Sequence, residues 1–475
     1  MLREVHVISI LGIVLSLGLL ITLAYRGVSV LLLAPLTALL AVAFGAPELM
    51  LASYTQIFMV SLGGFVIAYF PLFLLGAVFG KLMEASGAAH IIAQGIAAAL
   101  GERRAILAVV LACAVLTYGG VSLFVVAFAV YPIAQALFRR ADIPRRLMPA
   151  TIALGAFTFT MTALPGTPAI QNAIPMPYFG TTPFAAPGLG LIAAAVMLML
   201  GLWWLHWRSA QARSRGEGFT AEDEAQQPAD ELAPAAEAAP SHLELGKALL
   251  PVAVVIALNY LLSVHVLAGL DTRYLAEARF GATSIEALRG IWAVIAALTA
   301  AICLLVALWW GRLPQLKQLL DEGASASALP LLNTASQVGY GAVIASLAGF
   351  TLIRDAVLNI YPDNPLISMS IAINILAGIT GSASGGMSIA LQTLGSTWLQ
   401  MGEAAGLSPQ LLHRVTAVAT GGLDTLPHNG AVITLLGICG LTHRQSYLDI
   451  AMVAIVPAVA ALAVIVALGS LFGSF

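Results

Sequence analysis

The chain has 475 residues, of which 60% are hydrophobic and only 9% are charged. Soluble domains carry about 25% charged residues, so this sequence has too few charges to cover a water-soluble fold, which excludes an ordinary cytosolic enzyme. The net charge of −2, from 21 basic and 23 acidic residues, also excludes the basic surface of a nucleic-acid-binding protein. The composition therefore predicts an all-α polytopic membrane protein.

Apolar runs that can cross a membrane, at about 20 residues per crossing, follow one another along the chain. They lie near residues 5–25, 28–46, 57–80, 147–180, 186–207, 248–268, 289–310, 327–350, 411–440 and 447–470. Two further apolar stretches, 105–138 and 366–400, are too long for one helix and are interrupted by small residues.

Residues 209–246 differ from the rest of the chain because they are rich in alanine, proline and acidic residues. Such a composition cannot bury a core, so we expect a flexible linker between a first membrane repeat, 1–208, and a second, 247–475. Arginines at the start of the linker place it in the cytoplasm. Counting crossings outward then puts most basic residues inside, both termini outside, and His413 and Arg414 near the outer membrane boundary.

This count requires that residues 105–138 do not cross the membrane, because arginine pairs bracket the stretch on both sides. A split at Gly119 and Gly120 gives two arms of about 14–18 residues, each roughly 21–27 Å long. We therefore expect a re-entrant helical hairpin whose tip lies inside the membrane. The alternative is one long kinked helix.

Several short motifs occur twice, in the same order, roughly 265 residues apart. The pairs are Gly76-Ala77-Val78 with Gly341-Ala342-Val343, Gly119-Gly120-Val121-Ser122 with Gly385-Gly386-Met387-Ser388, Pro144 with Pro409, and Leu164-Pro165 with Leu426-Pro427. The run 57–80 is expected to run inward and 327–350 outward, so the copies are inverted. Inverted repeats with paired helix breaks are typical of secondary transporters that bind substrate near the membrane midplane.

Each repeat combines a re-entrant hairpin with a spanning helix broken at a proline. The helix N-termini at such breaks carry partial positive charge and suit a carboxylate. We expect substrate-binding residues from both repeats at these tips and breaks: Gly119, Gly120, Ser122, Thr162, Gly166, Thr167, Ser384, Gly385, Gly386, Ser388, His428 and Asn429. The alternative is that these groups only satisfy backbone atoms freed by the breaks.

Asp424 and His428 are predicted to carry a coupling proton. An aspartate inside a membrane costs about 2.5–3.5 kcal/mol, so its presence needs a reason. The corresponding stretch of the first repeat, 160–172, has no titratable group, so proton handling is expected to rest on the second repeat. The alternative is structural, with Asp424 capping a helix and His428 bonding to a freed carbonyl.

The runs FPLFLLGAVFGKLMEASGAA at 70–89 and LLNTASQVGYGAVI at 331–344, together with the paired motifs, resemble the gluconate:proton symporter (gluconate permease) family. That family belongs to an ion-transporter superfamily of inverted-repeat elevator carriers. The resemblance implies a homodimer in the bacterial cytoplasmic (inner) membrane that imports a small hydroxylated acid with protons. Gluconate, related sugar acids and 3-hydroxybutyrate are the implied substrates. The expected partners are this organic-acid anion, the proton, the lipid bilayer and a second copy, without cofactor or metal.

The sequence departs from the family at the first break. Sugar-acid permeases of the family have a histidine within this break, whereas this chain reads ALPGTPA there and has its histidine, His428, in the second break. The breaks also have few polar groups and no arginine or lysine beside them in the sequence. Both features favour a smaller monocarboxylate, with 3-hydroxybutyrate preferred.

Two other classes of protein compete with a proton-coupled importer. A cation/proton antiporter normally needs more than one acidic residue at its breaks, and only Asp424 lies there. An intramembrane enzyme needs a nucleophile–base pair or metal ligands. Neither a His-Glu-x-x-His motif nor paired aspartates occur, so we expect no enzymatic activity.

Overall fold

The computed structural model describes residues 2–26, 28–219, 239–361, 364–427 and 429–475. All secondary structure in these ranges is helical. Among these residues six helices are long and apolar enough to cross a membrane, and a helix pair bent by 97° raises the number to as many as seven. The predicted all-α polytopic membrane protein is confirmed.

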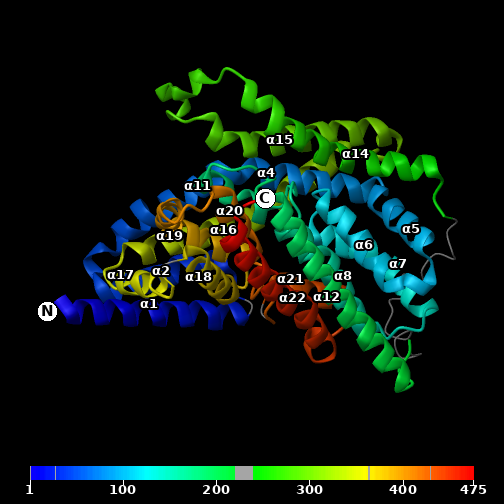
Figure 1. Cartoon of the computed structure of the whole chain (residues 1–475), viewed down its shortest axis with the longest axis horizontal. Helices are drawn as coiled ribbons and strands as arrows, with labels where there is room; N and C mark the ends of the chain where they lie inside the picture. The colour runs from blue at the N-terminus through cyan, green and yellow to red at the C-terminus, as the bar shows by residue number, and fades with distance from the viewer. Residues whose placement is uncertain (1, 27, 220–238, 362–363, 428) are drawn as a thin grey trace.

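Figure 1 shows the order of the helices. The first half contains α1 (Leu2–Tyr25), α2 (Val30–Gly45), the short α3 (Met50–Ala52), α4 (Met59–Ala85), α5 (Ala88–Leu100), α6 (Ala105–Tyr118), α7 (Leu123–Arg140), α8 (Met148–Ala156), α9 (Phe159–Thr162), α10 (Ile170–Ala173), α11 (Pro175–Phe179) and α12 (Pro187–Ser214). The second half contains α14 (His242–Tyr260), α15 (Ile285–Trp309), α16 (Leu316–Ser346), α17 (Phe350–Leu358), α18 (Pro365–Thr380), α19 (Ala383–Ala404), α20 (Pro409–Ala419), α21 (Gly430–Ile438) and α22 (His443–Phe472).

The equivalent helices α4 and α16 pack against each other in opposite directions. Near the C-terminal end of α4, Lys81 Nζ lies 3.1 Å from Glu322 Oε2 at the start of α16. Near its other end, Phe58 packs against Gly339. Two equivalent helices that pack antiparallel are related by a two-fold axis perpendicular to both helices. This relation is the geometry of an inverted repeat.

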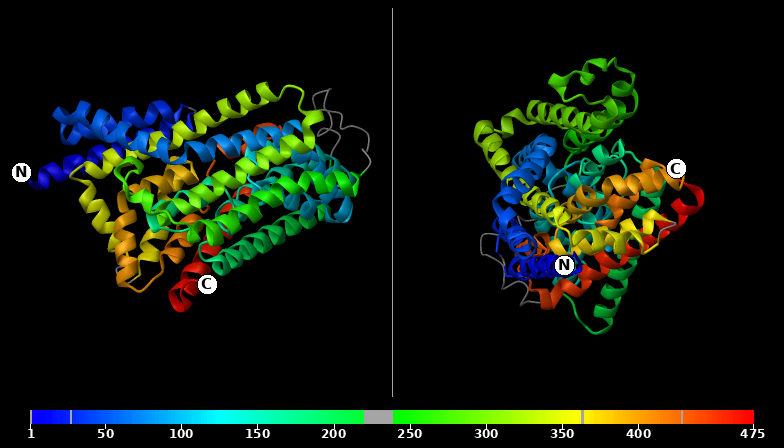
Figure 2. Two further views of the ribbon diagram at one scale, coloured as in Figure 1. Left: turned by 90° about the horizontal axis from the view of Figure 1, so that it is seen from above. Right: turned by 90° about the vertical axis from the view of Figure 1, so that its left-hand side faces the viewer.

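The second pair of equivalent helices, α12 and α22, has the same antiparallel arrangement. The Gly188 N–H at the start of α12 donates to the Phe475 carbonyl beyond the end of α22, at 2.8 Å. At the opposite ends, Arg208 Nε lies 2.7 Å from Asp449 Oδ1. The views in Figure 2 show that the long helices run side by side along the molecule.

The two halves also exchange packing partners. Helix α2 of the first half packs on α16, and its counterpart α15 packs on α4. Helix α8 of the first half packs on α22 of the second, and its counterpart α20 also packs on α22. Each half therefore completes the packing of the other around one core.

The stretch 105–138 forms two helices, α6 and α7, that pack on each other. Its two ends lie together, because Arg140 after the second arm pairs with Glu102 before the first at 3.2 Å. The expected hairpin is therefore present, and the single kinked helix is wrong. Its second arm, α7, is also long and apolar enough to cross a membrane alone.

The other predicted irregularities follow local sequence signals. Residues 366–400 give a second hairpin, α18–α19, whose turn begins at Gly381 with a φ of 60°. The run 147–180 is divided into α8 to α11, and 411–440 into α20 and α21, so neither is a continuous span. Helical structure reaches into both ends of the predicted linker, through Ser214 and from His242, and residues 220–238 lie outside the described ranges.

Candidate functional site

The tip of the first hairpin is bonded to the break of its own half. The Tyr118 hydroxyl donates to the Pro165 carbonyl at 2.7 Å. Gly120 has a φ of 93°, and a side chain there would lie 3.0 Å from Pro168. The tip residues Gly119 and Gly120 therefore serve as close-packing positions, since a Cβ on either would meet a neighbouring side chain.

The tip of the second hairpin is bonded to the second break by Asn429. Its side-chain amide donates to the Gly381 carbonyl at 2.9 Å and to the Asp424 carbonyl at 2.5 Å. Its Oδ1 accepts from the Ala431 and Val432 N–H groups and so caps α21. The predicted binding residue Asn429 therefore holds the break, the α21 cap and the hairpin tip together.

The two breaks meet through Arg414, which is fully buried on α20. Its guanidinium donates to the carbonyls of Thr162, Pro183 and Ala185 and to Asn172 Oδ1, over distances of 2.8–3.3 Å. These bonds use all five of its N–H groups. The expectation that Arg414 marks the outer membrane boundary is wrong, because the residue is an internal clamp on the first break.

Asn172 and His413 extend this network. The Asn172 amide donates to the carbonyls of Thr167 and Pro183, so its Oδ1 is the acceptor. His413 Nε2 lies 3.1 Å from that Oδ1 and must carry the proton, while Nδ1 lies 2.6 Å from the Thr181 hydroxyl. The network therefore holds the first break rigidly.

The predicted binding residues of the first break are also bonded. The Gly166 N–H donates to the Pro183 carbonyl, and its own carbonyl accepts from Asn259 at 3.0 Å. Thr162 Oγ1 bonds to the Thr158 carbonyl and lies against Gly421 in the second break. Thr167 Oγ1 accepts from the Ala169 N–H. In the first break, the predicted binding groups thus satisfy backbone atoms.

A second arginine, Arg145, lies just before α8 in the first half. It is buried, and its Nη2 donates to the Cys439 carbonyl beyond α21 at 2.7 Å and to the Tyr131 hydroxyl. Each half therefore sends an arginine to backbone carbonyls of the other half. No arginine lies beside either break in the sequence. In the folded chain, however, Arg414 contacts the first break, so the expectation of a site without nearby arginine is wrong.

The second break keeps polar atoms that have no hydrogen-bond partner among the described residues. They are Asp424 Oδ1, Thr425 Oγ1 and Asn374 Oδ1, the last lying directly against Gly422. Buried polar atoms without partners are rare and costly. The two breaks thus differ in degree: the first has one such atom, Gln171 Oε1, whereas the second has three, one of them a carboxylate oxygen. His428 lies outside the described residues.

The hairpin tips lie at different levels along the α4–α16 pair. Ser122 lies beside Gly80 near the C-terminal end of α4, whereas the tip with Ser384 and Gly385 lies beside Gln337 on α16. At 1.5 Å per residue, these levels are roughly 25–30 Å apart. The structure therefore does not bring Ser122 and Ser384 together.

Gly386 permits the closest approach within the second hairpin. A Cβ at this position would collide with the backbone of Ala377 on α18. We expect Gly386→Ala to separate α18 from α19 and to lower stability by about 2–3 kcal/mol, the range for overpacking. Thermal unfolding of the purified protein checks this, with Gly430→Ala, where nothing lies within 4 Å, as the control. Equal melting temperatures of the two variants would contradict the predicted loss of stability.

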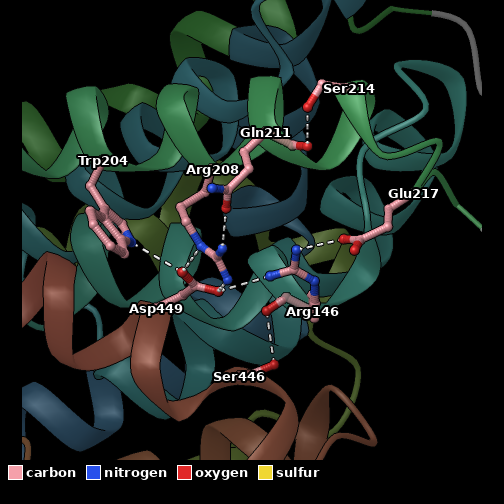
Figure 3. Close-up of polar contacts among 8 residues, drawn as sticks. All are labelled: Arg146, Trp204, Arg208, Gln211, Ser214, Glu217, Ser446 and Asp449. Carbon is pink, nitrogen blue, oxygen red and sulfur yellow. Dashed lines mark hydrogen bonds and ion pairs between the residues drawn. The ribbon is translucent and has the colours of Figure 1, made fainter.

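A charged cluster ties α12, α22 and the segment before α8 together at one end of the molecule (Figure 3). Asp449 is almost fully buried and accepts from Arg208, Arg146 and the Trp204 indole N–H. Arg146 also pairs with Glu217 at 2.8 Å, and this bond lowers the pKa of Glu217 below its usual value. The cluster fixes the crossing of the equivalent helices α12 and α22.

Comparison with known proteins identifies a relative over nearly the whole chain. No protein-family model matches. An uncharacterized transporter of Bacillus subtilis (strain 168), YxjC, is 46% identical over 459 residues, covering 95% of this chain and 97% of the relative. An uncharacterized transporter of Haemophilus influenzae is 43% identical over 82 residues, or 17% of this chain and 19% of that protein. The chain is therefore a multi-pass membrane protein that belongs to the transporter family of YxjC.

Proposed function

We propose that this transporter carries a small hydroxylated carboxylate together with a proton, by an elevator mechanism, and that it is not an enzyme. The observation that carries the proposal is the contrast between the two breaks within an inverted repeat. Among the described residues the first break keeps one buried oxygen without a partner, from the neutral amide of Gln171, whereas the second keeps three, including a carboxylate oxygen of Asp424. Substrate and proton then act at the second break and at the hairpin tip bonded to it.

The charge of Arg414 supports an anionic substrate. All of its hydrogen bonds end on neutral carbonyl or amide oxygens, so no carboxylate neutralises it within this network. A buried positive charge is felt strongly at short range in a medium of low dielectric constant. Because its N–H groups are all occupied, Arg414 attracts the anion through its field and positions the break, without bonding to the substrate.

The choice of substrate follows from the family resemblance and from the site. We propose kinship with the gluconate permeases, with gluconate, a related sugar acid or 3-hydroxybutyrate as the substrate. The lack of arginine beside the breaks in the sequence is one argument for a small acid, but the buried arginines of the folded chain remove it. The lack of a histidine in the first break still favours 3-hydroxybutyrate over gluconate.

The remaining features of the proposal concern assembly and placement. We propose a homodimer in the bacterial inner membrane, formed through the helices outside the hairpins and breaks, such as 28–46 and 289–310. The linker at 209–246 joins the two membrane repeats on the cytoplasmic side, and both termini lie outside. A monomeric mass after mild crosslinking would contradict the dimer.

Replacing Asp424 with asparagine is expected to abolish uptake driven by a pH gradient while leaving substrate exchange without a gradient. The carboxylate is buried and has an unpartnered oxygen, so it can take up a proton as substrate binds. His428→Gln is expected to act in the same direction. The measurement is uptake of labelled 3-hydroxybutyrate and gluconate into proteoliposomes.

Asp355→Asn is the matched control for this experiment, because Asp355 is exposed and pairs with the adjacent Arg354. Its uptake should equal that of the unaltered protein. If the Asp424 and His428 variants both still concentrate substrate against a pH gradient, proton coupling at these residues is wrong.

A cation/proton antiporter is the second candidate. The observation that favours it is that the unpartnered atoms at the second break are all oxygens, from Asp424, Thr425 and Asn374, and oxygen is the ligand preferred by hard cations. Proteoliposomes loaded with Na⁺ and given a pH gradient separate the two candidates. Cation efflux coupled to proton entry without any organic acid would favour the antiporter.

A further inference from the structure

One face of α16 lies directly against the first two turns of α19. The hydroxyls of Thr334 and Ser384 are 3.4 Å apart. One turn along α16, the carboxamide of Gln337 occupies the space that a side chain at Gly385 would need. One further turn along, Gly341 packs against Ile389. We name the polar part of this face, Asn333, Thr334, Ser336 and Gln337, the α16 strip.

The α16 strip and α19 contain buried polar atoms without partners among the described residues. On the strip these are Asn333 Oδ1, Ser336 Oγ and Gln337 Oε1, and on α19 the atom is Ser388 Oγ. Gln337 is 3% exposed and Ser388 is 1% exposed. Each such atom costs about 1–3 kcal/mol when it is left unbonded, so several of them at one helix contact point to a site for a polar ligand.

The N-terminal turn of α19 adds free backbone donors at the same place. The Ser382 hydroxyl caps the Gly385 N–H at 3.1 Å, and the Ser382 carbonyl accepts from Gly386. The N–H groups of Ala383 and Ser384 precede the first helical bond and have no such partner among the described bonds. Gln337 is therefore aimed into a helix N-terminus that has unoccupied donors.

We propose that the α16 strip, together with Ser384 and Ser388, binds the hydroxyl groups of the transported acid. This inference rests on the proposed function and names the residues that select its substrate. A hydroxyl group both donates and accepts, so it can satisfy amide oxygens such as Gln337 Oε1 and serine hydroxyls such as Ser388. The strip has no charged side chain, so it recognises the hydroxylated part of the molecule and leaves the carboxylate to the N-terminus of α19.

The first half has no equivalent of this strip. The repeat offset aligns Asn333, Thr334 and Gln337 with Ala68, Tyr69 and Leu72 on α4. Of these only tyrosine is polar, and its hydroxyl donates to the Ile174 carbonyl at 3.0 Å. Selection of the hydroxyl groups therefore falls to the second half, which is also the half with the unpartnered carboxylate oxygen of Asp424 at its break.

The test compares acids that differ only in a hydroxyl group. Binding of 3-hydroxybutyrate and of butyrate to the purified full chain is measured by titration calorimetry, and uptake of both is measured in proteoliposomes. Gln337→Leu keeps the volume of the side chain and removes its amide. We expect it to weaken binding of 3-hydroxybutyrate about tenfold, the effect of one lost hydrogen bond together with its unpaired partner, and to leave butyrate unchanged. Ser388→Ala is expected to act in the same direction.

Ser327→Ala on α16 and Thr393→Ala on α19 are the controls, because both hydroxyls bond to carbonyls of their own helix. Both variants should keep the selectivity of the unaltered protein. The inference is overturned if the unaltered protein does not prefer 3-hydroxybutyrate to butyrate, or if Gln337→Leu keeps that preference.

Binding and uptake separate this inference from the proposed function. Loss of preference in Gln337→Leu, with no pH-driven uptake by the unaltered protein, supports the strip and contradicts proton symport. Normal pH-driven uptake with unchanged preference in the variant supports symport and overturns the strip.

Discussion

Replacing Arg414 with methionine is expected to destabilise the protein by more than about 4 kcal/mol, an exceptional loss for one substitution. The change leaves the carbonyls of Thr162 and Ala185 buried without donors, at about 1–3 kcal/mol each, and also removes bonds to the Pro183 carbonyl and to Asn172 Oδ1. Arg414→Lys is expected to recover only part of the loss, because an ammonium cannot bond in the planar arrangement of a guanidinium. Thermal unfolding of the detergent-purified protein, followed by tryptophan fluorescence, measures both.

Arg354→Met is the control, because the Arg354 side chain is 43% exposed and its ion pair is with the adjacent residue Asp355. Exposed pairs of this kind contribute about 0–1 kcal/mol, so this variant should melt like the unaltered protein. Unaltered melting of Arg414→Met would show that the first break does not depend on the clamp.

The second large effect is expected at Asp449. Asp449→Asn should cost about 3–5 kcal/mol, because it leaves the guanidinium groups of Arg208 and Arg146 close together without their shared carboxylate. The lost charge also weakens the contact between α12 and α22, whose crossing the cluster fixes. Chemical unfolding of the purified protein measures the loss.

A double substitution separates the ion cluster from simple packing. In Asp449→Asn combined with Arg208→Met, one of the two unpaired arginine charges is gone. The double variant should therefore lose less unfolding free energy than the sum of the losses of the two single variants. Glu217→Gln is the control, because Glu217 is exposed and bonds to Arg146 alone within the cluster. Additive losses in the double variant would contradict a shared network.

Local signals in the sequence account for much of the fold. Glycine at 119–120 and at 381 permits the turns of the hairpins, and Pro165 and Pro427 lie in the non-helical segments between α9 and α10 and between α20 and α21. These residues act on the backbone within one helical turn, so the elements that they interrupt can be located without knowing the tertiary structure.

The interior of the site depends on contacts that no local pattern reports. Arg414 bonds to carbonyls more than 200 residues away, and counting charges along the chain could only place it at a membrane boundary. The available signal was an arginine inside the apolar run 411–440, which has to find internal partners if it does not face water. Gln337 is similar, since it lies in the run 331–344 that resembles the gluconate permeases, but its contact with Gly385 is visible only in three dimensions.

The exchange of helices between the halves has a consequence for biosynthesis. Helix α2 packs on α16, and α4 packs on α15 and α16. Helices α2 and α4 leave the ribosome long before these partners are made. During translation, the faces of α2 and α4 that end in the core must contact lipid or insertion factors. The first half therefore cannot mature as it is made, and folding of the whole chain waits until its last third has entered the membrane.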